Sequence, residues 1–306
     1  MSAQASTDTE AGTSGPIAIA GYASLDYAMN LAPFRGVDAT TIVRSRAEVW
    51  PRVGGIAHVT SAIAKASHAP VMAISWIGPD AGGDLWRDEV AATGVHVSGV
   101  IVDGTRSPTS HLFYPDDGGT ICIFDPADCH PSVLPEAQAD DVRAADWLIL
   151  TVGPEAPTRS ILDTLKPSTK LVWVVKHDSS SVPADLRARI LRRADVITLS
   201  ENERDFVQEY LGELRAGSFV IETCGSRGAR VFYSGADGLL EQGAASAAAV
   251  HDVDTTGAGD TFTGTLVAAL AEAGTLSVAS TLAALNLAAS ATADMLLQRK
   301  QASSLS

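Results

Sequence analysis

Basic residues are scarce in this sequence. It has 22 lysines and arginines against 36 aspartates and glutamates, which gives a formal net charge of −14 at pH 7. A protein that binds a nucleic-acid backbone needs clustered positive charge, so the shortage argues against a nucleic-acid partner. It does not exclude a nucleotide ligand, because local backbone amides can hold a small phosphate whatever the overall charge.

Cysteines are scarce as well. Cys122, Cys129 and Cys224 are the three, and none forms a C-x-x-C pair. A zinc site or a disulfide framework is therefore not expected, and the composition fits a reducing cytoplasm. The sequence also contains no Gly-Lys pair, which excludes the ordinary Walker phosphate loop.

Long apolar runs are absent too, so the sequence predicts no membrane-spanning segment and no membrane partner. The first fourteen residues, MSAQASTDTEAGTS, are small and polar and lack the apolar centre of a signal peptide. We interpret residues 1–14 as a disordered leader. The rest is long enough for one large domain, which we place at 15–298, followed by a short tail at 299–306.

Short apolar runs alternate with amphipathic helical segments along this domain. The predicted strands are Ile17–Ala20, Val71–Ile77, Trp147–Thr151, Leu171–Val175, Val196–Leu199 and Phe219–Thr223. Helices are predicted at 55–68, 84–93 and 184–193. This alternation indicates an α/β fold, with a mainly parallel sheet covered on both faces. Ligands are then expected beyond the carboxyl ends of the strands.

Two stretches interrupt the alternation, at about 37–52 and 108–125. Both carry β-branched and aromatic residues in partial alternation, and the DDGG of residues 116–119 is a hairpin-turn signal. We interpret them as a small β-layer added to the main sheet. Such a layer can serve as a lid over a substrate or as a dimer surface.

The most informative segment is His251-Asp-Val-Asp-Thr-Thr-Gly-Ala-Gly-Asp-Thr-Phe262, which an apolar run follows. A glycine-rich turn that opens a helix leaves free N–H groups at the positive end of the helix dipole. Gly257 and Gly259 let an anion approach without a Cβ in the way. Asp260 beside this anion hole would repel a resting phosphate. Its role is explained if it accepts the proton of a hydroxyl that attacks phosphorus.

Other interpretations of this segment remain open. A dinucleotide fingerprint fits poorly, because the glycine after Gly259 is Gly264 and the motif lies near the C-terminus. A calcium loop beginning at Asp252 would have Thr263, not Glu, at its twelfth position. Asp260 can also be no more than a helix-start acid that favours the dipole.

The stretch from Asp254 to Phe262 resembles the C-terminal signature of the ribokinase/PfkB carbohydrate and nucleoside kinases. Further matches follow in the order that the family shows, over about residues 16–295. They are Gly21-Tyr-Ala-Ser-Leu-Asp26, Gly54-Gly55, Gly78-Pro-Asp80-Ala-Gly-Gly-Asp84 with Gly94-Val95, and Thr223-Cys-Gly225-Ser-Arg-Gly228. The resemblance implies a ribokinase-like three-layer α/β/α sandwich with a small β-lid.

The resemblance also implies roles for individual residues. Asp26, Gly54 and Gly55 would bind the substrate, and Asp260 would be the general base beside an anion hole of Gly257, Ala258 and Gly259. Contacts to ATP would come from Thr223, Gly225, Gly228 and Asn286. Glu203 would organise Mg²⁺ through water, and Asp254 is the candidate for a monovalent cation such as K⁺.

The sequence departs from the family pattern at two positions. Val59 replaces an asparagine that helps to bind the sugar, and Ser200 replaces the asparagine of the family's N-x-x-E, here Ser200-Glu-Asn-Glu203. Lys176-His177-Asp178 ends a predicted strand on the ligand side. We interpret these three residues as solvated charge, with an unusual polar substrate as the alternative.

We therefore expect an ATP-dependent kinase acting on a hydroxyl of a sugar or sugar acid, or, as the alternative, of a nucleoside. A catalytically idle ligand-binding relative is a third hypothesis. A nicotinamide dehydrogenase is disfavoured by the lack of a glycine fingerprint followed by an acidic residue. The lid would be the surface of a homodimer.

Overall fold

The structure is a computed structural model, and it describes residues 15–116, 119–247, 250, 253 and 255–303. The leader predicted at 1–14 therefore lies outside the described residues. So do Asp254 and the middle of the predicted DDGG turn.

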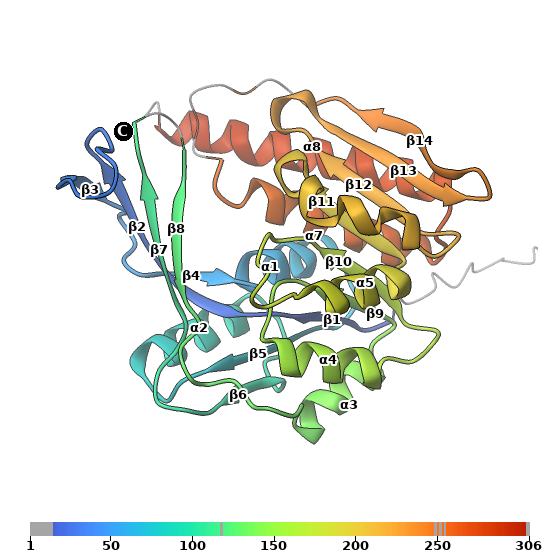
Figure 1. The fold of residues 1–306 in the computed structure, drawn as a ribbon, viewed down its shortest axis with the longest axis horizontal. Coiled ribbons are helices and arrows are strands. Elements are labelled where there is room, and N and C mark those ends of the chain that lie inside the picture. Colours follow the sequence, from blue (N-terminus) through green and yellow to red (C-terminus); the bar gives the residue numbers. More distant parts are fainter. Residues whose placement is uncertain (1–14, 117–118, 248–249, 251–252, 254, 304–306) are drawn as a thin grey trace, which may run out of the picture.

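A nine-stranded sheet forms the centre of the described part of the chain (Figure 1). In spatial order its strands are β14 (Gly238–Ala245), β13 (Ala229–Gly235), β12 (Phe219–Thr223), β11 (Val196–Ser200), β10 (Lys170–Val174), β9 (Trp147–Leu150), β1 (Ile17–Ala20), β5 (Val71–Ile77) and β6 (Val100–Val102). Neighbours from β6 to β12 pair in parallel, and β13 and β14 add an antiparallel edge. The predicted mainly parallel sheet is confirmed.

Helices cover both faces of this sheet. Those on one face are α1 (Ala57–Ala66), α2 (Ala81–Ala92), α7 (Ala258–Ala273) and α8 (Val278–Ser303). Those on the other are α3 (Glu136–Ala144), α4 (Glu155–Thr164), α5 (Ala184–Arg193) and α6 (Arg204–Val207). The result is the three-layer α/β/α sandwich.

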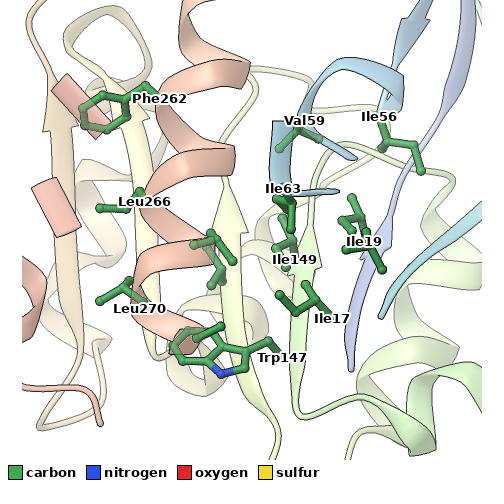
Figure 2. Packing of buried hydrophobic residues seen from close by; sticks show 14 of the residues in the cluster. Ile17, Ile19, Ile56, Val59, Ile63, Trp147, Ile149, Phe262, Leu266 and Leu270 are labelled. Carbon is green, nitrogen blue, oxygen red and sulfur yellow. The ribbon is translucent and has the colours of Figure 1, made fainter. Parts of the chain in front are cut away.

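Strand alternation builds the two cores that hold these layers together. In β1, Ile17 and Ile19 point to one face, while Ala18 and Ala20 point to the other. Helix α7 presents Phe262, Leu266 and Leu270 to the first face at four-residue spacing, as Figure 2 shows. This packing fixes α7, and with it the glycine-rich turn at its N-terminus.

A second sheet stands at one side of the sandwich (Figure 1). Its strands are β2 (Ala23–Leu31), β3 (Val43–Arg46), β4 (Arg52–Gly55), β7 (Thr109–Tyr114) and β8 (Ile121–Asp125). The predicted lid segments supply β3, β7 and β8 and only the first residue of β4. Strand β2 was missed because its residues follow β1 almost directly in the sequence, and the rest of β4 lies beyond the predicted lid.

The C-terminal boundary of the domain also differs from the prediction. Helix α8 continues to Ser303, through most of the tail placed at 299–306. Val278–Ala302 is long and apolar enough to cross a membrane by length and composition, with a mean hydropathy of 1.2, and 22% of the window tested is buried. This corrects the statement that no apolar run is long enough. The helix packs on α7, β13 and β14 through buried Ala284, Leu285 and Ala288.

Candidate active site

The glycine-rich turn has the local geometry that the sequence predicts. Gly257 has φ +73°, in the left-handed region that glycine adopts without strain, and α7 begins at the next residue. Asp260 is the third residue of the helix. The N–H groups of Gly259 and Asp260 lie in the first turn, where the helix itself offers no acceptor. Ala258 differs from the prediction, since its N–H donates to the carbonyl of Thr255 at 3.0 Å.

Two cavities meet at this helix start. One, of about 570 Å³, is lined by Thr256 and Asp260, and the other, of about 340 Å³, by Thr255, Ala258 and Gly259. The first turn of α7 therefore separates a cavity containing the candidate base from a cavity containing the candidate anion hole. We name them, after the roles that the sequence predicts for these residues, the acceptor cavity and the nucleotide cavity.

The lid provides one wall of the acceptor cavity. Ser24 and Asp26 from β2, together with Ser110 from β7, line it and are linked by hydrogen bonds. The Ser24 hydroxyl donates to the Asp26 carboxylate at 2.8 Å and lies 2.7 Å from the Ser110 hydroxyl. Asp26 thus lies within a lid strand.

The two glycines at the base of the lid make room for this carboxylate. A Cβ on Gly54 would lie 2.3 Å from the Asp26 carboxylate oxygens. The Gly54 carbonyl accepts a hydrogen bond from the Trp86 indole at 3.0 Å, which holds β4 against α2. Gly55 lines the acceptor cavity itself, whereas Gly54 lies behind Asp26.

The environment of Asp260 suits a base. Burial raises the pKa of its carboxyl, electrostatic interaction with His58 and Lys176 opposes this rise, and Asp26 adds to it. The net shift of the pKa is upward, which makes the carboxylate a stronger proton acceptor than an exposed aspartate.

Several residues that line the acceptor cavity were not assigned to it from the sequence. Lys176, His177 and Asp178 all line it, and Lys176 and His177 are exposed, in keeping with their interpretation as solvated charge. Because they directly follow β10, they lie at the carboxyl edge of the sheet, and that position was the available signal. His58, in the first turn of α1, was not singled out at all. Its Nε2 is buried without a hydrogen-bond partner among the described residues.

Asp178 is held firmly in place. Its carboxylate accepts hydrogen bonds from the backbone of Ser180 and from the hydroxyl of Ser181, at 2.9 and 2.7 Å. Burial alone would raise the pKa of Asp178, but these hydrogen bonds outweigh it and the net shift is downward. The Asp178 carboxylate therefore stays ionised and is a weaker proton acceptor than Asp260.

Apolar side chains complete the acceptor cavity. Val59, which replaces the family's asparagine, is buried in the core and also borders the cavity (Figure 2). The other apolar lining residues include Leu112, Phe124, Val152 and Val174. The cavity thus combines a polar end near Asp26 and Asp260 with apolar walls.

The nucleotide cavity brings together most of the residues expected to contact ATP. Thr223, Gly225 and Gly228 line it along the turn after β12. Apolar groups from α7 and α8, including Phe262, Ala289 and Leu296, form another wall. Asn286 is a correction: it is exposed, and its amide donates to the Leu282 carbonyl of its own helix at 2.9 Å. It does not line the cavity, whose first lining residue on α8 is Ala289, one turn further along the helix.

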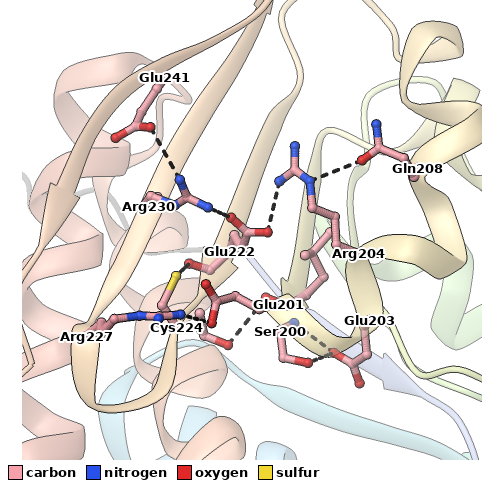
Figure 3. Close-up of polar contacts among 12 residues, drawn as sticks. Ser200, Glu201, Glu203, Arg204, Gln208, Glu222, Cys224, Arg227, Arg230 and Glu241 are labelled. Atoms are coloured by element: carbon pink, nitrogen blue, oxygen red, sulfur yellow. Dashed lines mark hydrogen bonds and ion pairs between the residues drawn. The ribbon is translucent and has the colours of Figure 1, made fainter.

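A buried glutamate beside the Thr223 turn forms ion pairs with arginines of α6 and β13 (Figure 3). Glu222, at the end of β12, is 1% exposed and pairs with Arg204 at 2.9 Å and with Arg230. Arg230 also reaches Glu241 on β14 at 3.8 Å. Removing one partner would leave a buried charge uncompensated, so this cluster fixes α6 and β13 around the Thr223 turn.

Glu203 lies where the family resemblance expects a residue that organises magnesium. Its Oε2 accepts from the Ser200 backbone at 2.8 Å and from the Ser200 hydroxyl at 2.9 Å (Figure 3). Its Oε1 lies 3.3 Å from the Lys176 ammonium. Among the residues that the structure describes, no three acidic, histidine or cysteine side chains cluster as a metal cage.

Sequence comparison identifies the family. Residues 23–306 match the profile described as pfkB family carbohydrate kinase. The chain belongs to the PfkB family of carbohydrate kinases. This PfkB protein is therefore a phosphotransferase that acts on an alcohol group. A search of curated protein sequences gave no significant match.

Solved structures share the fold of this PfkB kinase. Ribokinase of Arabidopsis thaliana, complexed with ribose and ATP, superposes with a TM-score of 0.73 at 20% identity, over 93% of both chains. Ribokinase of Cryptococcus neoformans, in complex with ADP, gives 0.75 at 20% identity over 92% of this chain and 94% of that one. A nucleoside kinase of Methanocaldococcus jannaschii gives 0.70 at 15%, over 93% and 92%. These similarities confirm the ribokinase-like sandwich.

Proposed function

We propose that this PfkB kinase transfers the γ-phosphoryl group of ATP to a hydroxyl of a neutral sugar or sugar-like molecule, with Asp260 as general base. The observation that supports this most strongly is the arrangement at the start of α7. Asp260 lines one cavity, and Ala258 and Gly259 line the other. A hydroxyl beside Asp260 and a phosphate beside Gly259 are then on the two sides of a single helix turn.

In the proposed reaction, the acceptor hydroxyl attacks the γ-phosphorus while its proton passes to the Asp260 carboxylate. The bond from phosphorus to the bridging oxygen breaks, and ADP leaves with the electron pair. The first-turn N–H groups of α7 stabilise charge on the transferring group. Asp26 orients the acceptor through its hydroxyls, and the lid excludes water.

Mg²⁺ would neutralise phosphate charge when bound, and Glu203 is the residue to hold it through water. A monovalent cation such as K⁺ is proposed near the anion hole. Its candidate residue, Asp254, lies outside the described residues.

The charges in the acceptor cavity favour a neutral acceptor. Asp26, Asp178 and Asp260 supply three carboxylates, against one ammonium from Lys176. A sugar acid would add a fourth negative charge. The apolar walls formed by Val59 and its neighbours favour a second candidate, a nucleoside, whose base would cover them.

An ADP-release assay tests the proposal. Purified protein would be incubated with ATP, Mg²⁺ and K⁺ and with neutral sugars, sugar acids and nucleosides in turn. We expect saturable ADP release with a neutral sugar or a nucleoside and little with the acids. If no neutral acceptor raised release above the rate with water alone, the proposal would be wrong and a ligand-binding role would take its place.

A further inference from the structure

The acceptor cavity and the nucleotide cavity contain little positive charge for a phosphoryl transfer. Among the described residues that line either of them, Lys176 is the one lysine or arginine. Unlike an imidazole, a lysine ammonium carries a full charge at neutral pH. Three carboxylates share the acceptor cavity with it, so Lys176 is the one full positive charge there that can offset their repulsion of an incoming phosphoryl group.

Lys176 lines the acceptor cavity and also pairs with Glu203, the candidate magnesium residue. It follows β10 at the carboxyl edge of the sheet, and its ammonium lies 3.3 Å from Glu203. Glu203 accepts a hydrogen bond from Ser200, which pairs in the sheet with Thr223 of the nucleotide cavity. Its side chain is 60% exposed, so the ammonium is accessible to a ligand. An ammonium has three N–H donors, and the ion pair with Glu203 needs one of them.

We propose that Lys176 is a catalytic residue of this kinase, whose ammonium binds the γ-phosphoryl group while it passes from ADP to the acceptor. This rests on the proposed phosphotransfer and adds a group to it. The ion pair with Glu203 holds Lys176 beside the phosphates before the acceptor arrives. As oxygen–phosphorus bonding shifts from ADP to the acceptor, the two remaining N–H donors contact the equatorial phosphoryl oxygens.

The electrostatics of Asp260 are consistent with this placement. The charge of Lys176 lowers the pKa of Asp260 against the effect of burial, which requires the ammonium to be near the base. The other charged or titratable groups lining this cavity are His58 from α1, Asp26 and Cys122 from the lid, Tyr22 before β2, and His177 and Asp178 beyond β10. None of them can offer a permanent positive charge to the phosphoryl group.

Equilibrium binding of a phosphoryl mimic tests the proposal without knowledge of the acceptor. Titration calorimetry would compare MgADP with MgADP plus aluminium fluoride, which imitates the transferring group. The variants are Lys176→Met, which removes the charge, and Lys176→Arg, which keeps it. Lys170→Met is the matched control, since Lys170 lies at the opposite end of β10 and pairs with Asp195 at 3.5 Å.

We expect Lys176→Met to bind the fluoride complex at least about tenfold more weakly, with MgADP affinity unchanged, as for the loss of a charge-assisted contact. Lys176→Arg should retain most of the affinity, and Lys170→Met all of it. Unchanged fluoride binding in Lys176→Met would overturn the proposal. So would an equal loss for MgADP alone, because Lys176 would then only order Glu203. If the wild type gained nothing from fluoride, the proposed phosphotransfer itself would fail.

Discussion

Replacing Asp260 by asparagine removes the proposed base while changing the size of the side chain very little. The variant keeps the first turn of α7, since Thr261 donates to the Gly257 carbonyl through its backbone. A general base contributes about 10²- to 10⁴-fold to rate, or about 3 to 5 kcal/mol of transition-state stabilisation. Neither nearby carboxylate can replace it well, because Asp26 and Asp178 are already hydrogen-bonded by serines. We expect kcat to fall by at least about a hundredfold.

The stability of the same variant provides an internal check. Folding raises the pKa of Asp260, so its contribution to stability is present below the unfolded-state pKa and is lost as pH rises through the folded-state pKa. At pH 7 the ionised carboxylate therefore destabilises the fold. Asp260→Asn should melt at the same temperature as the wild type or above it at pH 7, and the gain should vanish at acid pH.

Asp185 is the matched control, because it is also an aspartate in the first turn of a helix. A hydrogen bond from Arg159 lowers the pKa of Asp185, so its contribution to stability is present at neutral pH and is lost as pH falls through the folded-state pKa. Asp185→Asn should leave kcat unchanged and lower the melting temperature slightly. The assays are ADP release at saturating ATP and acceptor, and thermal melts across pH. Near-wild-type turnover by folded Asp260→Asn would refute the base assignment, and Asp260 would then be a helix-start acid.

Other expected outcomes concern the acceptor cavity, the core and the lid. Gly54→Ala places a methyl group against the Asp26 carboxylate and should displace it from the acceptor. We expect the acceptor KM to rise at least about tenfold, which corresponds to a loss of about 1.4 kcal/mol of binding free energy. An unchanged KM would mean that Asp26 does not bind the acceptor. His58→Ala removes the Nε2 that is buried without a hydrogen-bond partner among the described residues. It should raise the acceptor KM and leave the ATP KM unchanged, as measured by ADP release at varied acceptor and ATP concentrations. Leu266→Ala opens a cavity in the core and should lower the free energy of unfolding by about 2 to 5 kcal/mol in urea melts; a smaller loss would mean that the α7 contact is loose. The lid exposes Ile42 and other apolar side chains, so we expect a homodimer in light scattering, converted to monomer by Ile42→Lys.

Much of the site could be predicted because it is local in sequence. Gly257, Gly259 and Asp260 lie within four residues, and a glycine turn that opens a helix has one geometry wherever it occurs. Thr223, Gly225 and Gly228 form one turn after one strand, and they line the nucleotide cavity as expected. The alternation of strands and helices likewise predicted the sheet, since burial on both faces requires continuous apolar strands.

What the sequence could not show depends on neighbours that are distant along the chain. Asn286 has the residue type for a ligand contact, but its amide donates to the Leu282 carbonyl of its own helix, and the α8 residues that line the nucleotide cavity begin one turn later, at Ala289. Lys176 and His58 look like surface and helix residues until β10 and α1 bring both to Asp260.

The sequence by itself determined the family, the parallel sheet and the glycine-rich turn that opens α7, because local backbone preference and apolar periodicity act over short stretches. The tertiary structure alone decided which charges meet in the acceptor cavity. Those contacts depend on the order in which strands pair and on the face that each helix buries, and both are consequences of the whole core packing at once.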